Sequence, residues 1–353
     1  MRPTLPVRHA SGAKRTTLAA AGLLLGALLQ NACAIAKPLA LPDPPIAITV
    51  EATPITAFRP HSDQTRFGTL NFRGGLRLTS SFPGLGGISG FWLNPARTSD
   101  GEEFLAVTDA GVMLKGRLNS DGDRPIGLTD VSAAALLDDR GGVLALRKQA
   151  DAEALAVSPS QVIVAIENGD DLWIYPRADP LGKPGKPQRL PREIAALRPN
   201  KGLESLLYVP SGPLMGALIG IGEQGVREED DLPGFIIGGP TPGRFALRRS
   251  GVFSATSADV GPDGNLYLLE RHFAFTTGVS MQVRRFRLAD VKPGAVLDGE
   301  VLMSADMGFD IDNMEGLAVT VNAAGETLLT VVSDDNFSPI QRTLLLRFAV
   351  AGP

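Results

Sequence analysis

The chain has few residues of two types that often carry chemistry. Of its 353 residues, one is Cys and three are His. These numbers exclude a zinc site of Cys and His ligands, a disulfide framework and a cysteine nucleophile. No G-x-S-x-G motif is present, which argues against an α/β-hydrolase. Charged residues make up 20% of the chain and hydrophobic residues 44%, a balance that excludes wholesale disorder.

Acidic residues are also missing from the first part of the chain, up to Asp43. Four basic residues there precede an apolar run from 18 to 29. The run is too short for a transmembrane helix, which takes about 20 residues. With the small residues around Ala36, it predicts a signal peptide over residues 1–36, cleaved after Ala36. The mature chain is then expected to be periplasmic or secreted, with no transmembrane anchor. A lipid anchor at Cys33 is a minor alternative, because Gln30 stands where a lipoprotein signal normally has Leu.

The formal net charge is −4, and no region concentrates Lys and Arg. A nucleic-acid partner is therefore not expected, since phosphate backbones require concentrated positive charge. The 40 Gly and 27 Pro residues indicate many turns and few long helices. We interpret residues 37–60, which are rich in Pro and Ala, as an N-terminal arm, and residues 61–353 as one folded domain.

A repeat of short strand-like segments runs through this domain. Each copy begins with a small, an acidic and an apolar residue, continues through a turn, and ends with a strand that finishes in a second acidic residue. The first acidic position is occupied by Ser89, Glu153, Glu204, Asp259 and Glu315, and the second by Asp109, Glu167, Glu223, Glu270 and Asp334. The spacing is slightly wider than the roughly 40–50 residues of a propeller blade. The sequence therefore predicts an all-β protein, a β-propeller of about six four-stranded blades.

The repeated acidic residues have two interpretations. Equivalent positions of inner strands form rings around the axis of a propeller, and converging carboxylates either bind protons or hold a cation. Carboxylate oxygens without His or Cys suit Ca²⁺ first and Mg²⁺ second. Alternatively, the first-position side chains bond to backbone amides and join neighbouring blades, while the second-position side chains face solvent. Arg271 and Arg342 lie beside the repeat motifs and are candidates for contact with an anion.

Several motifs, in this order, resemble the phytase-like family named for the esterase-like activity of phytase. They extend from about Phe67 to Val350 and include R-F-G-T-L-N-F-R-G-G-L-R-L, G-G-I-S-G-F, D-A-E-A-L-A-V, G-L-E-S-L, P-D-G-N-L-Y-L-L-E-R, D-N-M-E-G-L-A-V and S-D-D-N-F-S-P-I-Q-R. The resemblance implies a secreted bacterial propeller that hydrolyses phosphate or carboxylic esters of small molecules. It implies matching positions at Ser89, Asp109, Glu153, Glu167, Glu204, Glu223, Glu270, Arg271, Glu315, Asp334, Asp335, Asn336, Gln341 and Arg342.

On this basis we predict Ca²⁺ ligands at Glu153, Glu204, Glu315 and Asp334. The predicted catalytic residues are Glu153, Glu315, Asp334 and Arg271, and the predicted substrate contacts are Arg271, Asn336, Gln341 and Arg342. The chain departs from the family pattern where Ala110 and Asn168-Gly169-Asp170 replace basic residues. This departure favours weaker phosphate binding or a different substrate. The alternative function is a periplasmic binding or scaffold propeller without catalysis.

Overall fold

The computed structural model describes Met1 and residues 41–352, except 97, 148–150, 168–170, 196, 198–201, 226 and 228. The predicted signal peptide, with Cys33 and the cleavage site after Ala36, lies outside the described residues apart from Met1. Residues 168–170, at which the family pattern is broken, lie outside them as well. Within the described part of the chain, no helix has the length and apolar character needed to cross a membrane.

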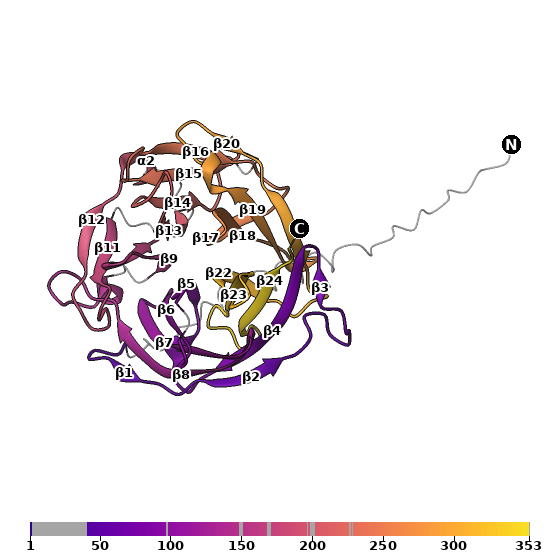
Figure 1. Ribbon diagram of the computed structural model, residues 1–353, viewed down its shortest axis with the longest axis horizontal. Helices are drawn as coiled ribbons and strands as arrows, with labels where there is room; N and C mark the ends of the chain where they lie inside the picture. The colour runs from indigo at the N-terminus through magenta and orange to yellow at the C-terminus, as the bar shows by residue number, and fades with distance from the viewer. Residues whose placement is uncertain are drawn as a thin grey trace. The chain divides into compact units, whose positions relative to one another are not determined.

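Five sheets are arranged radially around the central axis of the propeller, each with one edge strand innermost (Figure 1). Blade 1 contains β5 (Ile88–Leu93), β6 (Glu102–Thr108), β7 (Val112–Asp121), β8 (Arg124–Ala135) and, at its edge, β1 (Ile46–Ala47). Blade 2 contains β9 (Ala152–Val157), β10 (Gln161–Ile166), β11 (Asp171–Pro176) and β12 (Lys186–Arg189). Blade 3 contains β13 (Leu203–Tyr208), β14 (Leu218–Gly222), β15 (Leu232–Ile237), β16 (Gly243–Leu247) and the parallel edge strand β20 (Val296–Leu297).

Blade 4 contains β17 (Ser254–Val260), β18 (Asn265–Ala274), β19 (Gly278–Arg287) and β21 (Glu300–Ala305). Blade 5 contains β22 (Asn313–Val321), β23 (Thr327–Asp334), β24 (Thr343–Val350), β4 (Leu70–Thr79) and β2 (Glu51–Ile55), and β3 (Arg66–Phe67) pairs with β4. The described helices are single turns: η1 (Pro83–Leu85), η2 (Leu144–Arg147), α2 (Arg192–Ala195) and η3 (Leu288–Asp290).

The predicted all-β propeller is confirmed, but the expected number of about six blades is wrong, because there are five. Dividing the chain length by a typical blade length assumes that every segment forms its own blade. The segment before β5 does not do so. It provides β1 to the edge of blade 1 and β2, β3 and β4 to blade 5. The five first-position residues of the repeat thus correspond to five blades.

Blade 5 closes the ring by joining the two ends of the described chain. Its strand β4 comes from the N-terminal side and pairs in antiparallel fashion with β24, the last strand, from Leu70 opposite Val350 to Leu78 opposite Thr343. A buried ion pair then links this blade to blade 1, because Arg347 Nη1 lies 2.8 Å from Glu102 Oε2. Both side chains are at most 2% exposed.

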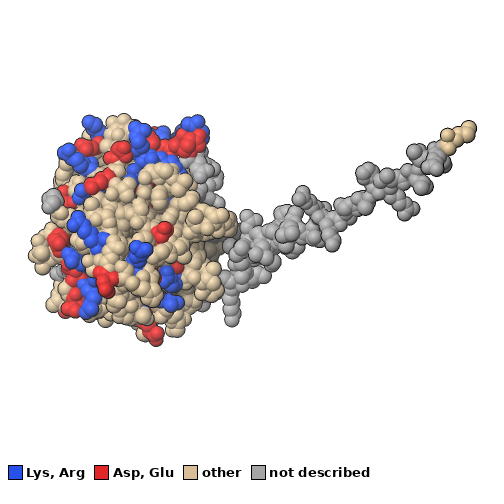
Figure 2. All heavy atoms as spheres, turned by 90° about the vertical axis from the view of Figure 1, so that its right-hand side faces the viewer, with Lys and Arg blue, Asp and Glu red and all other residues tan. Residues whose placement is uncertain are grey.

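The hydrophobic core lies between the faces of neighbouring blades. Strands β23 and β24 are buried along their whole length, and they read as nearly continuous apolar runs, as strands covered on both faces do. Between blades 4 and 5, the Phe58 ring packs against four other phenylalanine rings with centroids 5.0–5.6 Å away. Outside the core, basic and acidic side chains alternate over the face shown in Figure 2, without a field of one sign.

Candidate functional site

A β-bulge recurs near the start of every inner strand, where one extra residue interrupts the pairing with the second strand. The five bulged residues are Ser89, Glu153, Glu204, Thr256 and Glu315. A bulge changes the direction of a side chain, and bulges are common beside active sites. Three of these five equivalent positions carry a glutamate.

A second set of equivalent residues lies on or just after the second strand of each blade, opposite the residue two positions before the bulge. These residues are Asp109, Glu167, Glu223, Arg271 and Asp334. In blades 1 to 3 the same backbone bond fixes the position, with the N–H groups of Asp109, Glu167 and Glu223 donating to the carbonyls of residues 87, 151 and 202. Since the two strands of a hairpin are antiparallel, both sets lie at the same end of the channel. The repeat therefore builds one site from both acidic positions.

Blade 4 departs from the predicted pattern at both positions. The bulged residue is Thr256, not Asp259, which lies three residues further along β17. The second position is taken by Arg271, because Glu270 is one residue too early and pairs with Ala255. Glu270 is fully buried and forms an ion pair with Arg284 at 2.7 Å. Asp259 accepts a hydrogen bond from the Val319 backbone, as the alternative interpretation expected, whereas Glu270 is buried in an ion pair and does not face solvent.

The seven acidic residues of the two sets interact electrostatically with one another and with Asp151 around the channel mouth. We call these eight residues the acidic cluster: Asp109, Asp151, Glu153, Glu167, Glu204, Glu223, Glu315 and Asp334. Burial, then repulsion from Asp334, raises the pKa of the Asp109 carboxyl to about 8. Burial raises the pKa values of Glu153 and Glu204 well above their ordinary range, and each glutamate is repelled by other carboxylates. The cluster therefore holds protons at neutral pH unless a cation compensates its charge.

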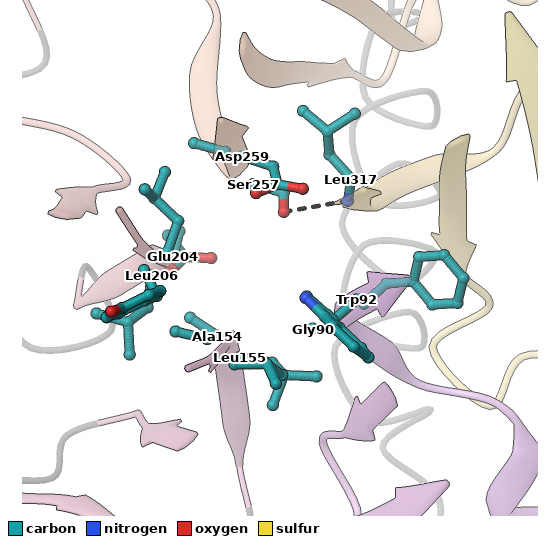
Figure 3. Close-up of a pocket in the computed structure, with 15 residues that line it drawn as sticks. Gly90, Trp92, Ala154, Leu155, Glu204, Leu206, Ser257, Asp259 and Leu317 are labelled. Carbon is teal, nitrogen blue, oxygen red and sulfur yellow. Dashed lines mark hydrogen bonds between the residues drawn. The ribbon is translucent and has the colours of Figure 1, made fainter. Parts of the chain in front are cut away.

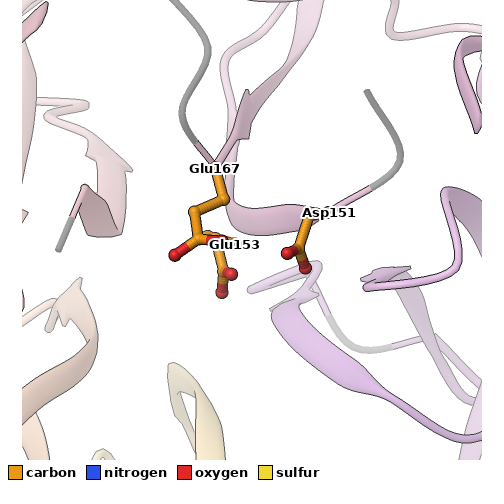
Figure 4. A group of neighbouring side chains, drawn as sticks. All are labelled: Asp151, Glu153 and Glu167. Carbon is orange, nitrogen blue, oxygen red and sulfur yellow. The ribbon is translucent and has the colours of Figure 1, made fainter. Parts of the chain in front are cut away.

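Three members of the cluster form a compact group in blade 2. Asp151, Glu153 and Glu167 each offer a carboxylate oxygen, and these oxygens lie within 4.8 Å of one another (Figure 4). All three residues are partly exposed, so the group is accessible from the channel. Carboxylates alone are hard ligands, of the kind that Ca²⁺ and Mg²⁺ take. Of these three, sequence reasoning predicted only Glu153 as a ligand. The available signal for Asp151 was the sequence D-A-E, in which a second acidic residue stands two positions before Glu153.

Arg271 brings a positive charge to the opposite side of the cluster. Its Nη2 lies 3.3 Å from Glu315 Oε1, and the charge of Glu204 also acts on it. Burial raises the pKa of Glu315 to about 7, although Arg271 opposes the shift. Asn313 Nδ2 donates to Glu315 at 2.7 Å and to Asp334 at 3.0 Å, which holds these two carboxylates side by side. The structure thus brings together the predicted ligands Glu153, Glu204, Glu315 and Asp334 and the predicted Arg271.

The other predicted substrate contacts lie in the β23–β24 connector beside this cluster. Asn336 is exposed, and its backbone N–H donates to Asp334 at 2.6 Å. Gln341 donates to Asp312 at 3.2 Å, and Arg342 pairs with Asp310 at 2.6 Å. Gln341 and Arg342 are therefore held by neighbouring acids and line a separate pocket, which is described below.

Below the acidic cluster the channel narrows to a void of about 40 Å³, which has room for only a few water molecules. Figure 3 shows Glu204, Ser257 and Asp259 around this void, with Trp92 on the other side. Ser257 Oγ and Asp259 Oδ2 accept hydrogen bonds from the backbone N–H groups of Leu317 and Val319, at 3.1 Å and 2.8 Å. These bonds join the inner strands of blades 4 and 5.

The partly buried Asp259 carboxyl predicts a pH effect on stability. Burial raises its pKa to about 7, against the hydrogen bonds from the backbone of Val319 and Val260. Its folded pKa is above the unfolded value of about 4, so the folded protein binds the proton more tightly, and stability falls as pH rises from about 4 to about 7. Asp259→Asn is expected to flatten this slope by up to about 1.4 kcal/mol per pH unit. Urea unfolding of both proteins at several pH values measures the difference. Equal slopes would contradict the assignment.

Comparison with known proteins identifies one matching family and several solved structures that are only distantly similar to this chain. The chain is similar to an α-L-arabinofuranosidase of Podospora anserina solved with cellotriose, with 10% identity, 86% of this chain and 98% of that chain covered, and a TM-score of 0.46. It is also similar to the glutaminyl cyclase of Myxococcus xanthus, with 12% identity, 76% and 93% coverage, and a TM-score of 0.39. Among curated proteins, no significant match is found. The family described as Phytase-like, esterase-like activity of phytase, matches residues 83–337, which include the whole acidic cluster. The chain therefore belongs to the Phytase-like family.

Proposed function

We propose that the acidic cluster holds a divalent cation, Ca²⁺ first and Mg²⁺ second, and that the protein hydrolyses phosphate or carboxylic esters of small molecules there. The observation that carries the proposal is the convergence of eight carboxylates, three of them with oxygens within 4.8 Å of one another, at one end of the channel. Membership of the Phytase-like family supports the same class of reaction. We also propose that the protein works outside the cytoplasm, on the basis of the predicted signal peptide.

The donor set fits such a cation. Asp151, Glu153 and Glu167 would provide the first oxygen ligands. Glu204 and Glu315 are close enough to Glu153 to interact with it electrostatically. The ligands must lose their protons to bind a cation, so binding is expected to release protons and to strengthen as pH rises. A bound cation supplies a polarised ester oxygen and a water molecule of lowered pKa.

The protein's own groups provide the remaining functions. The Arg271 guanidinium, which faces the cluster from blade 4, would hold the anionic part of the substrate. Glu315, with a pKa of about 7, is suited to accept the proton of the attacking water at neutral pH. Asn313 would keep Glu315 in place through its hydrogen bond.

A non-catalytic binding propeller is the second candidate. It is favoured by Asp259 and Ser257, which use their oxygens to join blades 4 and 5 instead of facing a substrate. Under this alternative, Glu315 contributes to stability and no ester is turned over.

The test is ester hydrolysis by the protein lacking residues 1–36, with Ca²⁺ and with a chelator. Phosphate release from phytate and nitrophenol release from 4-nitrophenyl esters measure the two ester classes. We expect turnover that disappears with the chelator, and a stabilisation of about 2.7 kcal/mol when Ca²⁺ is present at 100 times its dissociation constant. If Ca²⁺ and the chelator leave both activity and melting temperature unchanged, the proposal is wrong.

A further inference from the structure

Several exposed apolar side chains lie at the same end of the propeller as the acidic cluster. They lie on connectors between the second and third strands of a blade, or between one blade and the next, and the antiparallel order brings both kinds to this end. The residues are Leu146, Val252, Phe275, Met307, Phe337 and Ile340, with exposed fractions from 46% to 90%. Apolar side chains gathered at one place on a surface mark a site of interaction.

One of them, Phe337, forms the wall of a pocket between blades 5 and 1. The pocket has a volume of about 380 Å³. Phe82, Leu85, Phe337 and Pro339 contribute apolar surface to it, and its lining also includes the charged residues Arg77, Asp335 and Arg342. A pocket of this composition suits an organic group better than a bare phosphate ion.

The connector that carries Phe337 is held in an unusual backbone conformation. Asn336 and Phe337 have φ angles of 48° and 49°, in the left-handed region that bulky residues rarely adopt. Hydrogen bonds impose this conformation. Asp334 accepts from the Asn336 N–H at 2.6 Å, and Asp335 accepts from the N–H groups of Phe337 at 3.0 Å and Gly87 at 3.1 Å. Such strain is typical of functional sites, and here it determines where the Phe337 ring lies.

The ring lies next to the acidic cluster. A Cβ atom at Gly87 would be 2.5 Å from the Phe337 ring and 3.5 Å from the Asp109 carboxyl carbon. Gly87 also has a φ of 68°, so both space and backbone require glycine. Gly87 thus lies between the Phe337 ring, which lines the pocket, and the Asp109 carboxylate of the acidic cluster. A molecule that occupies both places needs an apolar part joined to the group that reacts.

We propose that the natural substrate is an amphiphilic ester, whose ester group lies in the acidic cluster and whose apolar chain lies against Phe337 in this pocket. The proposal rests on the hydrolytic function proposed above and names its substrate class. Phe337 is then a residue that determines specificity through contact with the chain. The other apolar residues at this end of the propeller would contact the rest of such a substrate as it enters.

The first experiment compares 4-nitrophenyl octanoate with 4-nitrophenyl acetate in wild type and in Phe337→Gly. Glycine adopts a positive φ without strain, so the variant is expected to fold, which its melting temperature will check. Because each buried CH₂ group adds to binding, we expect wild-type kcat/KM to be at least about tenfold higher for the octanoate. In Phe337→Gly this ratio is expected to fall below about threefold. Ile126→Ser is the matched control, since Ile126 is 49% exposed on β8, away from the mouth.

The second experiment measures binding without turnover, so that it does not depend on hydrolysis. Calorimetry with octylphosphonate and ethylphosphonate, in the presence of Ca²⁺, is expected to give the same chain-length preference and the same dependence on Phe337. Octylphosphonate binding that depends on Phe337, without ester turnover, would support the amphiphile site and contradict the hydrolase. Turnover and phosphonate binding that are both insensitive to chain length, or equally sensitive in wild type and Phe337→Gly, would overturn the amphiphile proposal while leaving the hydrolase.

Discussion

Replacing Glu315 with Gln is expected to lower kcat/KM for ester hydrolysis by roughly 100- to 1,000-fold, because the variant loses the proposed base. The melting temperature without Ca²⁺ is expected to be unchanged or higher. Burial makes the Glu315 charge unfavourable, and Asp334 adds repulsion, so a neutral amide of the same shape relieves the cluster. Steady-state kinetics and thermal unfolding on the same sample measure the two effects.

Glu300→Gln is the matched control for this experiment. Glu300 is an exposed glutamate on β21, paired with Arg285 at 2.6 Å, and exposed pairs contribute little to stability. We expect its activity to remain within about twofold of wild type. If Glu315→Gln instead unfolds at a lower temperature while activity per folded molecule persists, the scaffold interpretation is favoured.

Replacing Arg347 with Met is expected to destabilise the protein by about 3–5 kcal/mol, since it leaves the carboxylate of Glu102 buried without its countercharge. The pair lies between blade 5 and blade 1, and Arg347 also donates to Thr330 Oγ1 at 2.9 Å and to Ser120 Oγ at 3.1 Å. Urea unfolding followed by circular dichroism gives the free energy of unfolding.

A second substitution separates the lost pair from the lost packing. In Glu102→Met/Arg347→Met the buried charge is also removed, and most of the stability is expected to return. Arg285→Met, which breaks the exposed pair with Glu300, is expected to cost at most about 1 kcal/mol. A loss for Arg347→Met as small as that of Arg285→Met would show that the buried pair does not hold the ring closed.

The repeat made the propeller and most residues of the acidic cluster predictable from sequence. Glu153, Glu204 and Glu315 occupy the same bulge in three blades. An alignment by residue type therefore identifies the positions that are equivalent in the structure of these blades. In blade 4 the bulged residue is Thr256, and alignment by residue type moved the assignment to the nearest acid, Asp259. The same reasoning selected Glu270 and obscured the fact that Arg271 occupies the second position.

Other features depend on contacts that a sequence does not display. The blade number was overestimated because β4 pairs with β24, which lies near the other end of the described chain. No local sequence pattern indicates a pairing between segments so far apart. The pocket beside Phe337 arises from two segments, before β5 and after β23, that meet only in the folded ring.

The closure by β4 and β24 has a consequence for biosynthesis. During translation β4 is made early, but its partner β24 is among the last residues to be added, so one edge of β4 stays without its neighbour until synthesis is almost complete. Unpaired strand edges invite association with other chains, and long-range pairing is slow. A nascent chain of this protein therefore depends on protection of β4, and release of a product that ends before Thr343 would produce an aggregation-prone polypeptide instead of a smaller folded protein.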